Sequence, residues 1–91
     1  MQTSMKGRKR VKFSIAAEPH STVYVAGTFN GWNPRKHRLN FAHGIYSAYG
    51  LLRPGKHEYK FVINDRWLSD PKCEDWTPDG HGALNSVITV N

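Results

Sequence analysis

The sequence predicts an all-β fold, a two-sheet sandwich of about seven short antiparallel strands. Two observations lead to this class. Apolar residues recur at every second position in short runs, and clusters of Gly, Pro, Asn and Asp separate those runs. By contrast, no stretch of about a dozen residues keeps the spacing that an amphipathic helix needs.

The first two strands follow directly from the alternation. Residues 11–16 alternate apolar with polar or small side chains, which indicates a half-buried strand. Residues 22–29 alternate again, so Val23, Val25 and Phe29 are expected on one face.

The middle of the chain predicts a hairpin. A weak strand at 39–41 precedes a longer one at 45–52. Residues 53–56 read Arg-Pro-Gly-Lys, a sequence typical of a type II turn because Pro fixes the first central φ and Gly accepts the positive second one. This turn is expected to join 45–52 to 57–64 as an antiparallel hairpin, and the chain closes with a strand at 87–90.

The strand at 57–64 carries the first functional signal. Its alternation turns an aromatic face inward and Lys60 toward solvent. A two-residue turn at 64–65 or 65–66 then places Trp67 opposite Val62 or Asn64, and both registers put Trp67 on the outer face with Lys60. A three-residue turn with a bulge would re-aim the ring.

An outward Trp beside a donor side chain indicates a flat ligand platform. A large exposed aromatic ring is unfavourable in water unless it binds something. The carbon-bound hydrogens of a pyranose can lie on an indole, while Lys and Asn side chains hydrogen-bond the sugar hydroxyls. Lys60 and Trp67 therefore form a candidate sugar site on residue grounds alone.

Several ordered blocks of the chain closely resemble carbohydrate-binding module family 48. This family includes the glycogen-binding domain of the AMP-activated protein kinase beta subunit and the early-set N-terminal domains of isoamylases and branching enzymes. The resemblance runs from Val11 to the C-terminus, and an ordered set of blocks is more specific than any single motif. The matching blocks are residues 23–32 (VYVAGTFNGW), 54–63 (PGKHEYKFVI), Trp67 with Asp70-Pro71, and residues 85–90 (NSVITV).

The resemblance implies an immunoglobulin-like early-set sandwich that binds α-1,4-glucan (glycogen, starch or maltooligosaccharides) without cleaving it. Carried over by position, the two sugar-stacking Trp residues fall on Trp32 and Trp67, the hydrogen-bonding Lys on Lys60 and the sugar-binding Asn on Asn85. The strand pattern alone reaches Lys60 and Trp67. Without the resemblance, Trp32 is best interpreted as a structural plug at the end of the second strand.

The chain departs from the kinase-type members in one loop. Where those members carry Leu-Gly-Thr before the Asn, this chain has His81-Gly82-Ala83, so the apolar Leu and the loop hydroxyl are missing. Weak, shallow binding is expected, with a Kd of roughly 10 μM to 1 mM, or roughly 4–7 kcal/mol.

The basic character of the chain raises nucleic acid as a partner, but the charge distribution argues against it. The formal net charge is +6, and five of the thirteen basic residues lie in residues 6–12, which leaves eight basic against seven acidic ones. We therefore expect residues 1–10 to be a flexible basic tail, residues 11–91 to be the folded domain, and no nucleic acid to bind.

Other classes of function find little support in the sequence. The acidic residues cluster in polar loops, which does not indicate the paired carboxyls of a glycosidase, so no catalytic residue is predicted. The five His residues and the single Cys73 lack the spacing of metal ligands, so neither a metal nor a cofactor is expected. No apolar run approaches the roughly 20 residues of a membrane span, and the basic start lacks the apolar core of a secretion signal. No membrane partner and a cytoplasmic location are expected.

One alternative belongs to another class of function. The same sandwich could serve as a protein-interaction module that docks to a glucan-metabolising enzyme or a kinase without useful sugar binding. An exposed strand face can bind either a glucan or a protein, so the sequence leaves protein docking open as an alternative to glucan binding.

Overall fold

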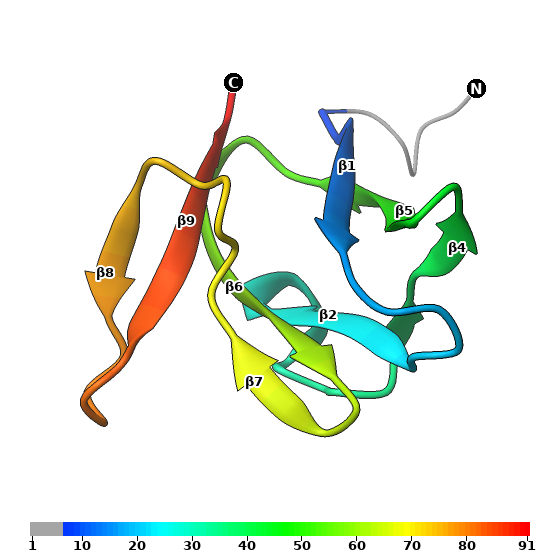
Figure 1. Cartoon of the computed structure of the whole chain (residues 1–91). Coiled ribbons are helices and arrows are strands. Elements are labelled where there is room, and N and C mark those ends of the chain that lie inside the picture. Colours follow the sequence, from blue (N-terminus) through cyan, green and yellow to red (C-terminus); the bar gives the residue numbers. More distant parts are fainter. Residues whose placement is uncertain (1–6) are drawn as a thin grey trace.

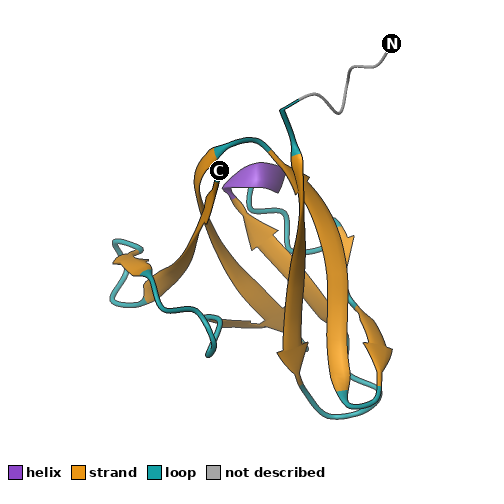
Figure 2. Ribbon diagram, turned by 90° about the horizontal axis from the view of Figure 1, so that it is seen from above, coloured by secondary structure: helices purple, strands orange, loops and turns teal. Residues whose placement is uncertain are grey.

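The computed structural model describes residues 7–91, and this part of the chain is almost entirely β (Figures 1 and 2). The all-β prediction is therefore confirmed. More strands form than the sequence predicts, because the extra ones have only two or three residues, too few for alternation to show. The elements are β1 (Lys9–Ala16), β2 (Val23–Gly27), the 3-10 turn η1 (Thr28–Asn30), β3 (His37–Arg38), β4 (Asn40–Ala42), β5 (Ile45–Leu52), β6 (Gly55–Ile63), β7 (Arg66–Leu68), β8 (Trp76–Pro78) and β9 (Leu84–Val90).

The strands form two antiparallel sheets. The smaller sheet has the order β1-β5-β4, and the larger has the order β3-β2-β6-β9-β8 with β7 also paired to β6. Strand β6 is the axis of the larger sheet, because its second half pairs with β2 on one side while β9 and β7 follow each other along the other side. In Figure 1, β8 and β9 lie at the end of the larger sheet that the smaller sheet does not cover.

The core lies between the two sheets. Phe13 of β1 meets Tyr59 of β6 edge to face across the interface, with ring centroids 5.0 Å apart. Burying aromatic and branched side chains of this kind is the main favourable contribution to folding. The buried cluster draws on both sheets and consists of Phe13, Ile15, Val23, Val25, Leu39, Tyr46, Leu52, Tyr59, Phe61 and Val90.

The predicted hairpin between residues 45–52 and 57–64 is wrong. Strand β5 pairs with β1 and β4, whereas β6 pairs with β2, β7 and β9, so the chain crosses from one sheet to the other at Arg53-Pro54. Both strands turn large apolar side chains into the same core, Tyr46 and Leu52 from one and Phe61 from the other. A Pro-Gly turn fixes where the chain reverses, but it does not decide whether the flanking strands share a ladder.

The predicted face pattern of β6 is confirmed. Tyr59 and Phe61 are buried in the core, and Lys60 lies on the opposite face. On that outer face Val62 is only 3% exposed, because it lies between Tyr24 on β2 and Trp67 on β7 in the cross-strand register. Tyr24, Val62 and Trp67 thus lie side by side on the outer face, away from the core between the sheets.

The N-terminal boundary differs from the expected one. Lys9 and Arg10 belong to β1, opposite Leu52 and Leu51, so the folded strand begins within the stretch predicted as a tail. Residues 1–6 of that predicted tail lie outside the described residues. Within the described chain, no helix has the length and apolar character needed to cross a membrane.

Candidate functional site

A shallow groove of about 490 Å³ runs over the outer face of the larger sheet. It collects side chains from β6, β7 and β9 and from the loops after η1 and β8. All the residues carried over from the family resemblance, Trp32, Lys60, Trp67 and Asn85, line it. Their role in sugar binding stays a prediction.

Trp67 reaches the groove because of the turn that precedes it. Asn64 and Asp65 have φ angles of 50° and 69°, the two positive values of a type I′ hairpin turn. This two-residue turn pairs Trp67 with Val62, which selects one of the registers that the sequence left open. The ring therefore stands on the outer face, 47% exposed.

Trp32 is held by a compact turn at the end of β2. The Asn30 side chain accepts a hydrogen bond from the Gly27 N–H at 3.0 Å and donates one to the Val25 carbonyl at 3.0 Å, which tightens η1. The Trp32 N–H then donates to the Gly27 carbonyl at 2.9 Å. Trp32 has a φ of 58°, in the left-handed region that bulky residues rarely adopt.

Lys60 carries the positive charge of the groove and is fixed by an ion pair. Its ammonium donates to the Asp79 carboxylate at 2.7 Å, and both side chains are little exposed, at 12% and 13%. Asp79 also accepts hydrogen bonds from the backbone N–H groups of His81 and Ala83, at 2.7 and 3.2 Å. The hydrogen bonds from Lys60 and from the His81 N–H lower the pKa of Asp79 from its ordinary value of 3.8 to about 2. Asp79 therefore stays ionised and ties the loop 79–83 to Lys60.

Asn85 of β9 lines the groove together with Glu58 of β6. Its amide nitrogen donates to the Glu58 carboxylate at 2.9 Å, and Asn85 itself is only 8% exposed. Because the amide nitrogen of Asn85 faces the carboxylate, the amide oxygen of Asn85 remains available as an acceptor. The second carboxylate oxygen of Glu58 also has acceptor capacity.

Sequence reasoning missed three residues of the groove: Glu58, Asp79 and His81. Glu58 could have been found, because it shares the outward face with Lys60 two positions along the strand. In the sequence, Asp79 belongs to the cluster of acidic loop residues, for which turn and solubility roles are expected. Its spacing to Gly80 and Gly82, both at positive φ, is the signal of an Asx-type turn, but nothing in the sequence places that turn over Lys60. The loop that lacks the family's Leu contributes His81 to the groove.

Trp76 does not line this groove. It pairs with Ser86, whereas its neighbour Thr77 pairs with Asn85, so Trp76 lies on the face of β8 and β9 opposite to Asn85. The ring is 57% exposed there. Leaving Trp76 outside the predicted site therefore agrees with its position.

The arrangement suits a neutral, hydroxylated ligand with flat apolar faces. Two indole rings offer stacking surfaces, the Lys60 ammonium has donor capacity beyond its bond to Asp79, and the Asn85 and Glu58 oxygens accept. Its open, shallow form provides no enclosed pocket for catalysis. Among residues 7–91, no group of three or more His, Cys, Asp or Glu side chains is arranged to hold a metal ion.

Comparison with protein families identifies one match that covers nearly the whole folded part. The model described as the glycogen recognition site of AMP-activated protein kinase matches residues 11–91. Two relatives illustrate the range of proteins that carry a similar segment. Protein FLOURY ENDOSPERM 6, chloroplastic, of Oryza sativa subsp. japonica is 30% identical over 81 residues, which cover 89% of this chain and 15% of that protein. The 5'-AMP-activated protein kinase subunit beta-1 of Homo sapiens is 35% identical over 68 residues, which cover 75% of this chain and 24% of the subunit.

A solved structure supports the fold. The maltogenic amylase from S. marinus matches 93% of this chain with a TM-score of 0.77 at 22% identity, and the match covers 14% of the amylase chain. This likeness confirms the sandwich architecture and carries no functional argument by itself. The chain thus spans a minor part of each of these proteins.

Proposed function

The chain belongs to the family of the glycogen recognition site of AMP-activated protein kinase, and from this premise we propose that it binds α-1,4-glucan in the groove between Trp32 and Trp67 without cleaving it. One observation carries the proposal. Two Trp side chains, a Lys, an Asn and a Glu converge on one open groove, although they come from segments far apart in the sequence.

Each polar group of the groove has a role in this proposal. Glucose units stack on the indole rings of Trp32 and Trp67. Lys60 donates to sugar hydroxyls, and the oxygens of Asn85 and Glu58 accept from them. Asp79 is a positioning residue, because it holds Lys60 and the loop that brings His81 to the groove.

A matched pair of Trp variants tests the proposal. Trp67→Ala should weaken binding to glycogen by on the order of 1–3 kcal/mol, the contribution of one stacked ring. Trp76→Ala removes an even more exposed indole from the opposite face and should leave glycogen binding unchanged. Affinity electrophoresis in glycogen-containing gels measures both. Equal retardation of wild type and Trp67→Ala would contradict the proposal.

Docking to a partner protein is a second function that one observation favours. Trp76, Leu68 and Leu84 are 57%, 44% and 40% exposed on the face away from the groove, where the smaller sheet does not reach β8. Exposed apolar side chains in proximity indicate an interaction surface. The name of one relative, a kinase subunit, suggests a kinase as that partner, and a glucan-metabolising enzyme is the other candidate from the sequence. Loss of partner co-purification in Trp76→Ala, with glycogen binding intact, is the expected result.

We propose the cytoplasm as the location of the protein. The name of the rice relative gives the chloroplast as the alternative. Fractionation of cells that express the full-length protein decides between them, because recovery in plastids would overturn the cytoplasmic assignment.

A further inference from the structure

Trp67 lines a second hollow as well as the groove. This hollow has a volume of about 530 Å³ and lies over β2, β6 and the loop that follows η1. Trp67 is the side chain that the two spaces share. A ligand that covers Trp67 in the groove therefore reaches the border of the second hollow.

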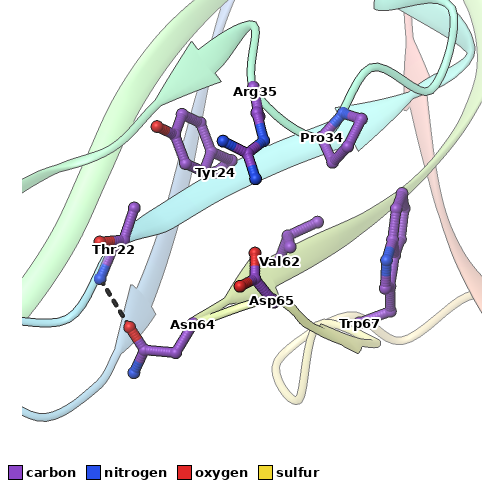
Figure 3. A pocket seen from close by; sticks show the side chains of 8 residues that line it. All are labelled: Thr22, Tyr24, Pro34, Arg35, Val62, Asn64, Asp65 and Trp67. Carbon is purple, nitrogen blue, oxygen red and sulfur yellow. Dashed lines mark hydrogen bonds between the residues drawn. The ribbon is translucent and has the colours of Figure 1, made fainter.

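The floor of the second hollow is a row of side chains across three strands. Tyr24 pairs with Val62, and Val62 pairs with Trp67, so the three lie side by side on the outer face. Figure 3 shows Tyr24 at one end of this row and Trp67 at the other, with Val62 between them. The floor thus continues the aromatic surface that begins at Trp67.

Two oppositely charged groups project over this floor. Arg35 and Asp65 both line the hollow, and Figure 3 draws the Arg35 guanidinium near Tyr24 and the Asp65 carboxylate near Val62. Within residues 7–91 the ion pair that forms is Lys60–Asp79, so the hydrogen-bonding capacity of Arg35 and Asp65 is not used in a salt bridge. Both side chains are exposed.

The backbone under both charged groups is fixed locally. The Arg35 N–H donates to the Asn33 side-chain oxygen at 2.9 Å, which closes a tight turn. Asp65 occupies the second position of the type I′ turn, and the Asn64 side chain accepts a hydrogen bond from the Thr22 N–H at 2.9 Å. The two groups are thus presented from anchored turns.

We propose that the second hollow is a continuation subsite for the same α-glucan chain. This inference rests on the proposed function of the groove. A glucan stacked on Trp67 runs on toward Tyr24, and its next glucose units receive hydrogen bonds from Arg35 and donate hydroxyl hydrogen bonds to Asp65. A neutral polyol fits this pair, because Arg35 donates and Asp65 accepts hydrogen bonds, and their opposite charges give the hollow no net attraction for an ion of either sign.

Chain continuity gives a direct test. Maltodecaose can extend from the groove into the second hollow, whereas β-cyclodextrin is a closed ring with no chain end to extend. Arg35→Ala removes a hydrogen bond, and Asp65→Asn replaces a charge-assisted bond with a neutral one, so each should lower the affinity for maltodecaose by roughly three- to tenfold, the effect expected at an exposed site. The affinity for β-cyclodextrin should not change. Asp65→Asn keeps a residue that tolerates the left-handed φ, so the turn is retained.

Lys36→Ala is the matched control for charge. Lys36 is an exposed neighbour of Arg35 that does not line the hollow, so its loss should leave the affinities for both sugars unchanged. Titration calorimetry of the full chain measures the affinities. Wild-type NMR spectra provide a readout without substitution, since side-chain signals of Tyr24 and Arg35 should shift with maltodecaose and stay in place with β-cyclodextrin.

The outcomes separate this inference from the function on which it rests. Suppose that both sugars bind to the wild type. If Arg35→Ala and Asp65→Asn then leave the affinities for maltodecaose and β-cyclodextrin unchanged, or lower both affinities equally, the continuation subsite is overturned, whereas glucan binding in the groove is retained. If neither sugar binds to the wild type, the glucan function fails and the subsite fails with it.

Discussion

Trp32 combines an unfavourable backbone with a half-buried position in the groove. Its φ of 58° costs on the order of 1–3 kcal/mol for a residue that is not Gly. Trp67 lines the same groove without a left-handed backbone, so this strain belongs to the turn after η1, where the Trp32 N–H donates to the Gly27 carbonyl.

The strain at Trp32 leads to a prediction about two substitutions. Trp32→Gly relieves the left-handed backbone, whereas Trp32→Ala keeps the strain, so the Gly variant should be the more stable by about 1 kcal/mol. Both variants should lose glucan affinity, because both lack the indole. Urea denaturation compares their free energies of unfolding, and a more stable Ala variant would contradict the assigned conformation.

Asp79 gives a prediction about pH. Its pKa is lowered to about 2 in the folded chain by the bonds from Lys60 and the loop backbone, below the ordinary 3.8 that applies to the unfolded chain. The folded state thus holds the ionised form more strongly, and the stability this contributes is present above about pH 4 and is lost as the pH falls toward 2. Asp79→Asn lacks this contribution at every pH.

The difference in melting temperature between wild type and Asp79→Asn measures that contribution. It should be largest at neutral pH and should shrink as the pH is lowered from about 4 to about 2. A constant difference across this range would show that Asp79 does not act through its charge.

At the scale of elements, the turn after β2 depends on close backbone approach. A Cβ added at Gly27 would lie 2.6 Å from the Phe29 ring and 2.9 Å from the Tyr59 Cβ, and it would also clash with the Glu58 carbonyl. Gly27 pairs with Tyr59 of β6, so this clash would push β2 and η1 away from the strand that carries Lys60. The position of Trp32 relative to Lys60 depends on this packing.

Gly27→Ala should therefore destabilise the fold by roughly 1–3 kcal/mol, the usual cost of overpacking a dense site. Gly44→Asn is the control, because Gly44 has open space around its Cα and a φ of 83° that Asn tolerates. Thermal unfolding followed by circular dichroism compares the two. Equal melting temperatures for Gly27→Ala and wild type would mean that the turn packs less closely than described.

The elements also show what sequence reasoning can and cannot reach. Alternation within β6 is a local property, so the outward position of Lys60 and the inward one of Phe61 followed from the sequence. Which strand pairs with which depends on the packing of both sheets, so the β5–β6 hairpin was wrong. Asp79 escaped notice for the same reason, since its contact with Lys60 joins a loop to a strand 19 residues away.

At the scale of the whole molecule, the larger sheet presents different functions on its two faces. Its inner face packs on the smaller sheet, and its outer face bears the groove and the second hollow joined by Trp67. Tyr59 belongs to the inner face: its ring is buried in the core, and its hydroxyl donates a hydrogen bond to the Asp70 carboxylate at 2.7 Å. Burial and the bond to Asp70 raise the pKa of Tyr59 above its ordinary value.

Ligand binding to the groove should stabilise the whole fold. A sugar that binds only the native chain, present at about ten times its Kd, contributes about 1.4 kcal/mol of stability. For a chain of 91 residues this corresponds to a rise in melting temperature of about 5–10 °C. Differential scanning fluorimetry with maltoheptaose measures it, and cellobiose, which has β-linked glucose, serves as the control sugar.

The three Trp residues of the chain allow one measurement of the central claim, because each contributes a separate indole N–H signal. Trp32 and Trp67 line the groove, and Trp76 lies on the opposite face of the sheet. In an NMR titration with β-cyclodextrin, the signals of Trp32 and Trp67 should shift together along one binding curve while that of Trp76 stays in place. Unmoved signals from Trp32 and Trp67 at several millimolar sugar, an excess over every Kd expected for this groove, would contradict glucan binding.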